Sequence, residues 1–251
     1  MLTKIEYKFL VPESKLDNLR SDLTPFTELD KYSEIDDRKE YTVRSIYYDT
    51  PGFECYVEKK EGLKIRKKYR LRGYNEEHPD NVLFLEIKRK NKNYIRKNRA
   101  PFLYKNINSV LFKNKLAGNI LSNGNGKEMA DAKRFFYNYH TKALRPVVLI
   151  IYEREAFFSK FDPTLRLTFD KNLRSVMYPL KDDVYSAKKA KYAMPGFFIF
   201  EVKFVAGMPL WVTNIIQKYG LSRQAISKYT ITIDSHKRKM PKFNIINDFR
   251  L

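Results

Sequence analysis

One stretch of sequence decides how the chain is expected to fold: Lys64-Ile65-Arg66-Lys67-Lys68-Tyr69-Arg70-Leu71-Arg72-Gly73-Tyr74. Every second residue from Lys64 to Arg72 is basic, and at the two-residue period of a β-strand these side chains lie on one face. Neighbours on that face stand about 7 Å apart, so they repel one another unless an anion lies between them. A single strand of this kind is most simply a solvated surface, and it becomes informative only if other strands repeat the pattern.

Other segments do repeat the alternation of apolar and charged residues. They lie at 82–90, 97–99, 146–158, 165–170 and 197–205. In the first of them, Leu83 and Leu85 point away from Glu86 and Lys88. Short strands with one apolar and one charged face are typical of an antiparallel sheet.

The remaining segments complete the predicted architecture. Further strands are expected at 5–11, 43–49 and 230–233, and helices after Pro12, at 53–62, twice within 107–140, and at 209–219. Helices interrupt the strand series at only a few places, which argues against a doubly wound parallel sheet. We therefore predict a mainly β protein with helices (α+β), built as an eight-stranded antiparallel β-barrel decorated with helices. Residues 1–251 are expected to form a single domain.

Composition restricts the class of partner. The formal net charge is +20, which predicts an anionic partner: nucleic acid, an anionic membrane or a phosphate chain. The single cysteine, Cys55, excludes an intramolecular disulfide and a cysteine-based metal cluster. No apolar run reaches the roughly 18 residues of a membrane span, and no signal-peptide core follows Met1. We expect a cytoplasmic protein.

The charged faces of the expected strands are strongly unbalanced. Ten positions are basic and three are acidic: Lys8, Arg70, Arg72, Lys88, Lys97, Arg99, Arg154, Arg166, Lys203 and Lys228, against Glu6, Glu86 and Glu201. An excess of seven positive charges inside a barrel would be strongly destabilising if the lumen were empty and dry. Such a lumen is plausible only if it is wet and holds a polyanion.

Three of the expected strands share the tripeptide Glu-x-Lys. These are Glu6-Tyr7-Lys8, Glu86-Ile87-Lys88 and Glu201-Val202-Lys203, and both charged residues fall on the same strand face each time. A carboxylate in that position can bind a divalent cation while the neighbouring lysine binds a phosphate oxygen. One such tripeptide carries no weight, but three on separate strands indicate a common site.

Taken together, the segments resemble the triphosphate tunnel metalloenzymes (CYTH-like), and within them the VTC domain, the polyphosphate polymerase domain of the vacuolar transporter chaperone and its bacterial relatives. The resembling stretches are IEYKF (5–9), SIYYDT (45–50), KYRLRGY (68–74), FLEIKRK (84–90), RKNR (96–99), YEREAF (152–157), LRLTFD (165–170), FEVKF (200–204) and SKYT (227–230). They occur in the family's order over most of the chain. The resemblance implies an eight-stranded antiparallel tunnel whose basic walls bind a nucleotide triphosphate.

The resemblance also implies roles for individual residues. Phosphate-binding positions are Lys8, Arg70, Arg72, Lys88, Lys97, Arg99, Arg154, Arg166, Lys203 and Lys228. Six of these, Arg70, Arg72, Lys88, Arg154, Arg166 and Lys228, are expected to act in catalysis. Glu201 resembles the metal-binding carboxylate, with Glu6 and Glu86 as further candidates, for Mn²⁺ or Mg²⁺.

The resemblance implies a metal-dependent ATP-polyphosphate phosphotransferase, a polyphosphate polymerase that transfers the γ-phosphate of ATP to a growing chain. Lys4 stands where the wider superfamily often has a further glutamate, which favours the polymerase over the hydrolase branch. Two alternatives stay open: a triphosphate or polyphosphate hydrolase on the same fold, and a non-catalytic module that binds polyphosphate or nucleic acid. Most aromatics share the apolar faces, which argues against nucleic acid. The sequence leaves room for a membrane partner.

Overall fold

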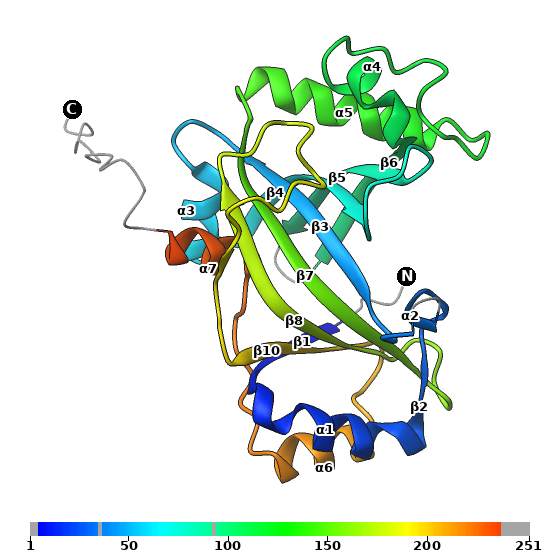
Figure 1. The fold of residues 1–251 in the computed structure, drawn as a ribbon, viewed down its shortest axis with the longest axis vertical. Coiled ribbons are helices and arrows are strands. Elements are labelled where there is room, and N and C mark those ends of the chain that lie inside the picture. The colour runs from blue at the N-terminus through cyan, green and yellow to red at the C-terminus, as the bar shows by residue number, and fades with distance from the viewer. Residues whose placement is uncertain (1–4, 35–36, 92–93, 237–251) are drawn as a thin grey trace, which may run out of the picture.

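The structure, a computed structural model, describes residues 5–34, 37–91 and 94–236 (Figure 1). Its strands are β1 (Ile5–Pro12), β2 (Thr27–Leu29), β3 (Tyr41–Asp49), β4 (Ile65–Tyr74), β5 (Val82–Asn91), β6 (Tyr94–Leu103), β7 (Arg145–Ser159), β8 (Arg166–Met177), β9 (Lys191–Tyr192) and β10 (Phe197–Phe204). Its α-helices are α1 (Leu16–Leu23), α2 (Lys31–Glu34), α3 (Glu54–Lys60), α4 (Ile107–Leu111), α5 (Lys127–Thr141), α6 (Leu210–Lys218) and α7 (Lys228–Ser235). The mainly antiparallel sheet with helices confirms the predicted α+β class.

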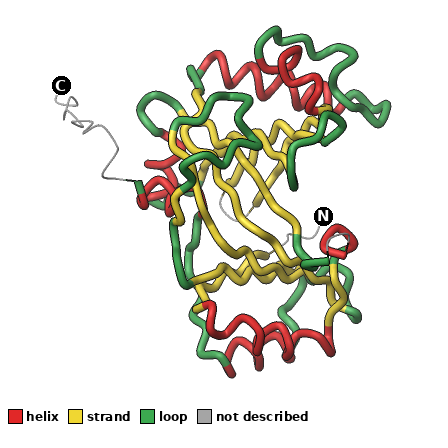
Figure 2. The backbone as a smooth tube through the Cα atoms, in the orientation of Figure 1, coloured by secondary structure: helices red, strands yellow, loops and turns green. Residues whose placement is uncertain are grey.

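The strands form one curved sheet, in the order β1-β10-β8-β7-β3-β4-β5-β6, with β2 and β9 attached to β7 and β8. All strand pairs are antiparallel, as predicted. The predicted closed barrel is wrong, because β1 and β6 stand at opposite ends of this order and do not pair within the described residues. The sheet is therefore curved but open between β1 and β6 (Figure 2).

The sequence of β6 explains why this edge pairs with no further strand. Pro101 has no backbone N–H to donate to one, and its carbonyl accepts a hydrogen bond from the backbone N–H of Leu121, beside an isolated bridge between Phe102 and Ile120. Arg96, Lys97 and Arg99 give the same strand a dense positive charge, which is a common way to prevent edge pairing. An alternation of apolar and charged residues specifies two faces of a sheet, but it does not specify closure.

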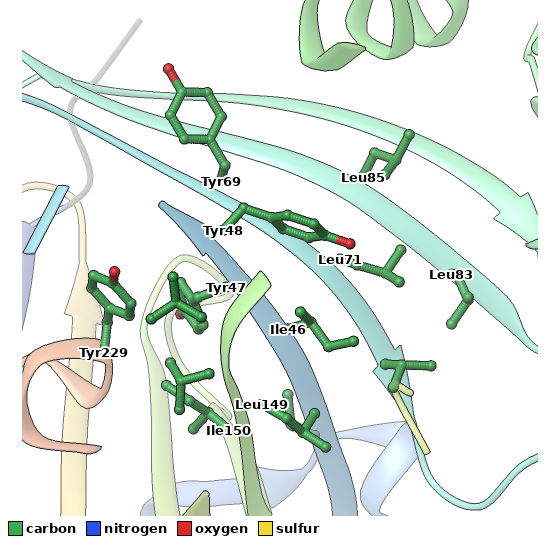
Figure 3. Packing of buried hydrophobic residues seen from close by; sticks show 14 of the residues in the cluster. Ile46, Tyr47, Tyr48, Tyr69, Leu71, Leu83, Leu85, Leu149, Ile150 and Tyr229 are labelled. Atoms are coloured by element: carbon green, nitrogen blue, oxygen red, sulfur yellow. The ribbon is translucent and has the colours of Figure 1, made fainter. Parts of the chain in front are cut away.

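The apolar faces of the strands pack under helices and leave the charged faces free. Tyr48, Tyr69 and Leu71 are buried among the side chains that Figure 3 shows, and Phe135 of α5 packs edge-on against both tyrosines. A second cluster joins β1, β8 and β10 to α1 and α6, with Phe169, Phe198 and Phe200 among its fully buried members. Close packing on one face fixes the other face as the place where function can reside.

The predicted helices after Pro12 and within 53–62, 107–140 and 209–219 are confirmed. The last predicted strand, 230–233, is wrong, because these residues belong to helix α7. The β-branched sequence favours a strand, but the Ser227 side chain accepts a hydrogen bond from the Thr230 backbone N–H and starts the helix. Tyr229 and Ile233, four residues apart, are both buried.

Within the described residues, no helix is both long enough and apolar enough to cross a membrane.

Candidate functional site

The concave face of the sheet lines one large cavity of about 1670 Å³. Among the described residues, fifteen lysines and arginines line it, against four aspartates and glutamates. These side chains come mainly from every second position of β1, β4, β5, β6, β8 and β10. The alternation that places apolar residues under the helices thus places the cations around a common space.

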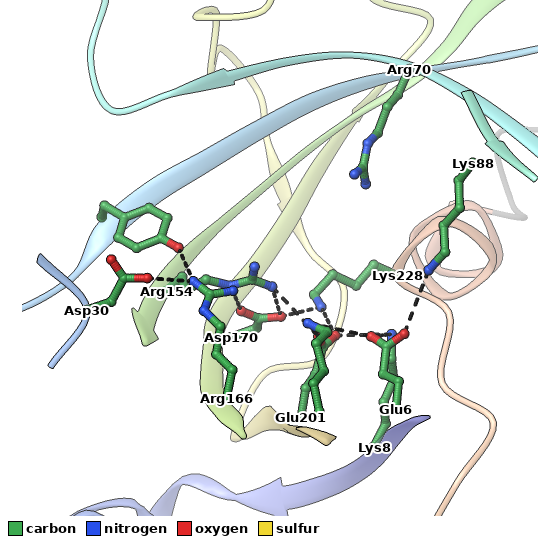
Figure 4. Close-up of polar contacts among 12 residues, drawn as sticks. Glu6, Lys8, Asp30, Arg70, Lys88, Arg154, Arg166, Asp170, Glu201 and Lys228 are labelled. Carbon is green, nitrogen blue, oxygen red and sulfur yellow. Dashed lines mark hydrogen bonds and ion pairs between the residues drawn. The ribbon is translucent and has the colours of Figure 1, made fainter. Parts of the chain in front are cut away.

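All thirteen residues singled out in the sequence line this cavity: Lys8, Arg70, Arg72, Lys88, Lys97, Arg99, Arg154, Arg166, Lys203, Lys228, Glu6, Glu86 and Glu201. Figure 4 shows several of them converging from different strands. The open sheet therefore brings the set together without closing into a barrel.

Sequence reasoning missed several further members of the site. The additional cations are Lys59, Arg66, Lys68, Lys90 and Arg223. Three of them, Arg66, Lys68 and Lys90, belong to the alternation on β4 and β5 and could have been counted. Lys59 comes from α3 and Arg223 from a loop. Strand alternation does not apply to these segments, so it could not predict that the two side chains line the cavity.

Glu201 lies at the centre of a cluster of four cations. Its Oε1 atom is 3.1 Å from Lys8 Nζ and 2.8 Å from Lys228 Nζ, and its Oε2 atom is 2.9 Å from Lys203 Nζ. Arg154 Nη2 lies 3.9 Å from Oε2. Burial raises the pKa of Glu201, but these cations outweigh it and hold the pKa well below its usual range. The carboxylate is thus a fixed negative charge.

Asp170 of β8 adds a second buried carboxylate behind this cluster. Its oxygens accept two hydrogen bonds from Arg154, at 2.5 and 2.7 Å, and it also pairs with Lys228. The aspartate is 1% exposed. A bidentate arrangement fixes the plane of the guanidinium, so Arg154 is held in one orientation at the cavity wall.

Glu86 pairs with two arginines on the opposite wall. Its oxygens lie 2.5 Å from Arg70 and 3.1 Å from Arg99. Burial raises the pKa of Glu86, but the neighbouring arginines outweigh it and lower the pKa to about 2. Arg70 also donates a hydrogen bond of 2.9 Å to the Tyr47 hydroxyl. Burial raises the pKa of Tyr47 too, yet Arg70 and its basic neighbours lower it to about 7.

The remaining predicted cations have neutral, single or weaker partners. Arg72 donates to Ser45 Oγ at 3.1 Å, and Arg166 pairs with Asp30 at 2.9 Å. Lys88 lies 3.7 Å from Glu6. Burial and repulsion from Arg70 lower the pKa of Lys97 to about 8. The cavity therefore holds cations whose charge is only partly compensated by the protein.

Burial also acts on a lysine that the sequence prediction did not count. It lowers the pKa of Lys68 to about 7, and Lys8 and Lys88 add repulsion. The Lys68 ammonium donates a hydrogen bond of 2.9 Å to Ser227 Oγ. A lowered lysine pKa is the expected sign of a site that lacks its counter-charge.

A divalent cation prefers several oxygen ligands. Within the described part of the chain, no group of three His, Cys, Asp or Glu side chains could hold one. The neighbouring carboxylates of Glu6 and Glu201 share Lys8 and Lys203 as ion-pair partners. These residues fit a metal ion only as single carboxylate ligands, with phosphate oxygens supplying the others.

The two ends of the cavity differ in chemistry. At one end β4, β5 and β6 place Arg66, Lys90 and Ile95 side by side, and Lys59 also lines the cavity wall. At the other end lie the cross-strand partners Arg72 and Phe84, with aromatic and amide side chains nearby: Tyr41, Tyr74, Asn75 and Asn81. One end is thus basic and the other largely aromatic.

The fold and the site together define an α+β protein whose curved antiparallel sheet lines a basic cavity. A family model described as the VTC domain matches residues 3–237, so the chain belongs to the VTC domain family. The resemblance seen in the sequence is confirmed, and this membership indicates a function related to polyphosphate.

Other comparisons are distant. The structure of the PH1819 protein from Pyrococcus horikoshii OT3 is similar over 92% of this chain and 98% of that chain, with 11% sequence identity and a TM-score of 0.47. No curated protein sequence matches this chain.

Proposed function

We propose that this protein is a metal-dependent polyphosphate polymerase that transfers the γ-phosphate of ATP to the end of a phosphate chain in the cavity. The observation that carries the proposal is the charge of the cavity wall, with fifteen cations against four carboxylates. A phosphate chain supplies repeating negative charge along its whole length, which matches a cavity of this extent. As a reaction that consumes ATP, it would take place in the cytoplasm.

The proposed reaction needs positioning more than proton transfer. A terminal oxygen of the chain attacks the γ-phosphorus of ATP, a new P–O bond forms, and the bond to the β–γ bridging oxygen breaks to release ADP. The attacking oxygen is already ionised and needs no base. Arg70, Arg72 and Lys88 on one wall, with Arg154, Arg166 and Lys228 on the other, would hold the two phosphate groups in line and stabilise charge on the transferred group.

The carboxylates support transfer to phosphate over transfer to water. Each of the four that line the cavity is held in an ion pair: Glu6 with Lys8, Asp30 with Arg166, Glu86 with Arg70, and Glu201 with Lys228. A carboxylate held ionised by cations is a weak general base at neutral pH. A hydrolase on this scaffold would have to activate water without one.

Glu201 would be the protein ligand of a divalent ion, Mn²⁺ or Mg²⁺, bound together with the phosphate chain. Such an ion would supply positive charge next to the phosphate oxygens. Lys8, Lys203 and Lys228, which surround Glu201, would bind phosphate oxygens.

The two cavity ends suggest a direction for the substrates. The aromatic and amide side chains at one end suit a nucleoside, which can stack and hydrogen bond there. The basic end suits the growing chain.

The test is the product of ATP turnover with manganese or magnesium. ADP together with long phosphate chains is expected. Free phosphate or tripolyphosphate as the only phosphorus product would indicate the hydrolase. Binding of polyphosphate without turnover under any metal would indicate a non-catalytic module.

A further inference from the structure

The ends of three neighbouring strands carry a surface that the cavity does not explain. Cross-strand partners form successive rows over β4, β5 and β6, and the rows are Lys67, Arg89 and Arg96; Arg66, Lys90 and Ile95; and Ile65, Asn91 and Tyr94. Successive residues of a strand point to opposite faces, so the middle row, Arg66, Lys90 and Ile95, faces the cavity and lines it. The other two rows lie on the opposite face of the sheet, and of their six residues only Tyr94 also borders the cavity. We call these six residues the strand-end surface; three of them are basic and none is acidic.

The cations of this surface are only partly compensated. Like charges directly opposite one another destabilise a sheet, and Lys67, Arg89 and Arg96 are opposed across three strands. Arg89 Nε and Nη2 are buried and have no hydrogen-bond partner among the described residues. The carboxylate of Glu58 reaches this surface, where it accepts a hydrogen bond from the backbone N–H of Lys67, and its single charge offsets only part of the positive charge. The surface therefore favours an anionic partner.

Large apolar side chains project among these cations. Ile65 is 65% exposed and Tyr94 is 71% exposed. Isolated apolar residues are common on surfaces, but here both lie on the strand-end surface beside three cations. Water is a poor environment for such a group, whereas a membrane interface accommodates basic, aliphatic and aromatic side chains together.

We propose that the strand-end surface docks on an anionic phospholipid bilayer, with its cations on the headgroups and Ile65 and Tyr94 at the boundary with the acyl chains. This inference does not depend on the proposed polymerase activity. A nucleic acid would use the cations but gives no role to the exposed Ile65. A second copy of this strongly basic chain would bring like charges together.

The first experiment measures co-sedimentation with vesicles of phosphatidylcholine, with and without phosphatidylglycerol. The protein is expected to bind only the anionic vesicles, and less at high salt. The double variant Arg89→Glu and Arg96→Glu should bind at least about tenfold more weakly. The charge-matched control is the double variant Lys113→Glu and Lys115→Glu, which changes two exposed lysines near α4. The control should bind anionic vesicles at least about threefold more tightly than the Arg89→Glu and Arg96→Glu variant.

The second experiment tests the apolar contact. Cys55 is buried, so a thiol-reactive environment-sensitive dye can be placed selectively at Ile65→Cys, or at Leu180→Cys as a control of similar exposure. A blue shift at position 65 and none at 180 is expected on anionic vesicles. Equal vesicle binding by the two charge variants, or a dye at 65 that stays in water, would overturn the proposal.

A third measurement separates this surface from the cavity. Arg89→Glu with Arg96→Glu should leave tripolyphosphate affinity within about twofold of the parent protein, because neither residue lines the cavity. A large loss of tripolyphosphate affinity with unchanged vesicle binding would assign the surface to the phosphate chain instead and overturn membrane docking. Preferential binding of single-stranded DNA over anionic vesicles would do the same in favour of nucleic acid.

Discussion

Tyr229 donates its hydroxyl hydrogen bond to Asp49, which lies 180 residues earlier in the chain. Asp49 is fully buried and also accepts backbone N–H groups of Thr50, Cys55 and Tyr56. One carboxylate thus joins the start of α3 to the first turn of α7. Because Lys228 precedes Tyr229, this contact fixes where the lysine enters the cavity.

The variant Tyr229→Phe tests that relationship. Losing one hydrogen bond to a buried charged acceptor should lower the free energy of unfolding by about 1–3 kcal/mol. Tripolyphosphate should also bind more weakly, because Lys228 is less well oriented. Urea denaturation and a binding titration check both effects. Tyr137→Phe on α5 is the control, since Tyr137 is 69% exposed, and it should change neither. Unaltered phosphate affinity in Tyr229→Phe would remove the positioning role.

The sequence predicts the composition of the site better than its architecture. Alternation along single strands places nine of the ten predicted cations, because a two-residue period assigns faces without knowledge of the partner strand. The tenth, Lys228, starts helix α7 and reaches the cavity for another reason. It does not reveal register, so the pairing of Arg154 with Asp170 could not be foreseen. The same limit applies to the open edge between β1 and β6, since closure depends on strand length, twist and edge residues rather than on alternation.

Local propensity fails at α7 for a related reason. The sequence Tyr-Thr-Ile-Thr-Ile from Tyr229 favours a strand, and β-propensity is strongly dependent on context. The Ser227 cap and the buried contacts of Tyr229 and Ile233 decide for a helix. A serine three residues before a threonine is too common a signal to outweigh five residues of strand-like sequence.

Arg154→Lys should separate charge from geometry. Lysine keeps the positive charge but cannot make the two parallel hydrogen bonds that Asp170 accepts, so phosphate affinity should fall about tenfold and stability by about 2 kcal/mol. The control is Arg174→Lys, because Arg174 makes an equivalent pair with Glu153 outside the cavity. That variant should lose stability alone. An equal loss of phosphate affinity in both variants would contradict a specific role for Arg154.

Anion binding should weaken as the pH rises through the range in which Lys68 and Lys97 titrate. Their pKa values are about 7 and 8 in the folded protein, so both are fully charged only below that range. Sulfate keeps its charge here, and its affinity should fall between pH 6 and 9.

Stability without an anion should change in the opposite direction. These pKa values lie below those of the unfolded chain, so the two lysines disfavour folding most below pH 7 and progressively less as the pH rises toward 10. Sulfate titrations and thermal melts across this range test both signs. The pH dependence should be smaller in Lys68→Met, and an undiminished dependence would mean that other groups cause it.

Glu201→Gln should have opposite effects on stability and on metal-free anion binding. Glutamine keeps the size of the side chain but removes the charge that faces Lys8, Lys203 and Lys228, so the free energy of unfolding should fall by about 3 kcal/mol. Because the wall becomes more positive, sulfate should bind more tightly in the absence of metal. Metal-dependent ATP turnover should be lost, since the proposed carboxylate ligand is gone.

The control Glu153→Gln breaks an ion pair outside the cavity and should reduce stability without changing sulfate affinity. Weaker sulfate binding in Glu201→Gln, or full turnover at low metal concentration, would show that Glu201 orders the cations and does not serve as a metal ligand.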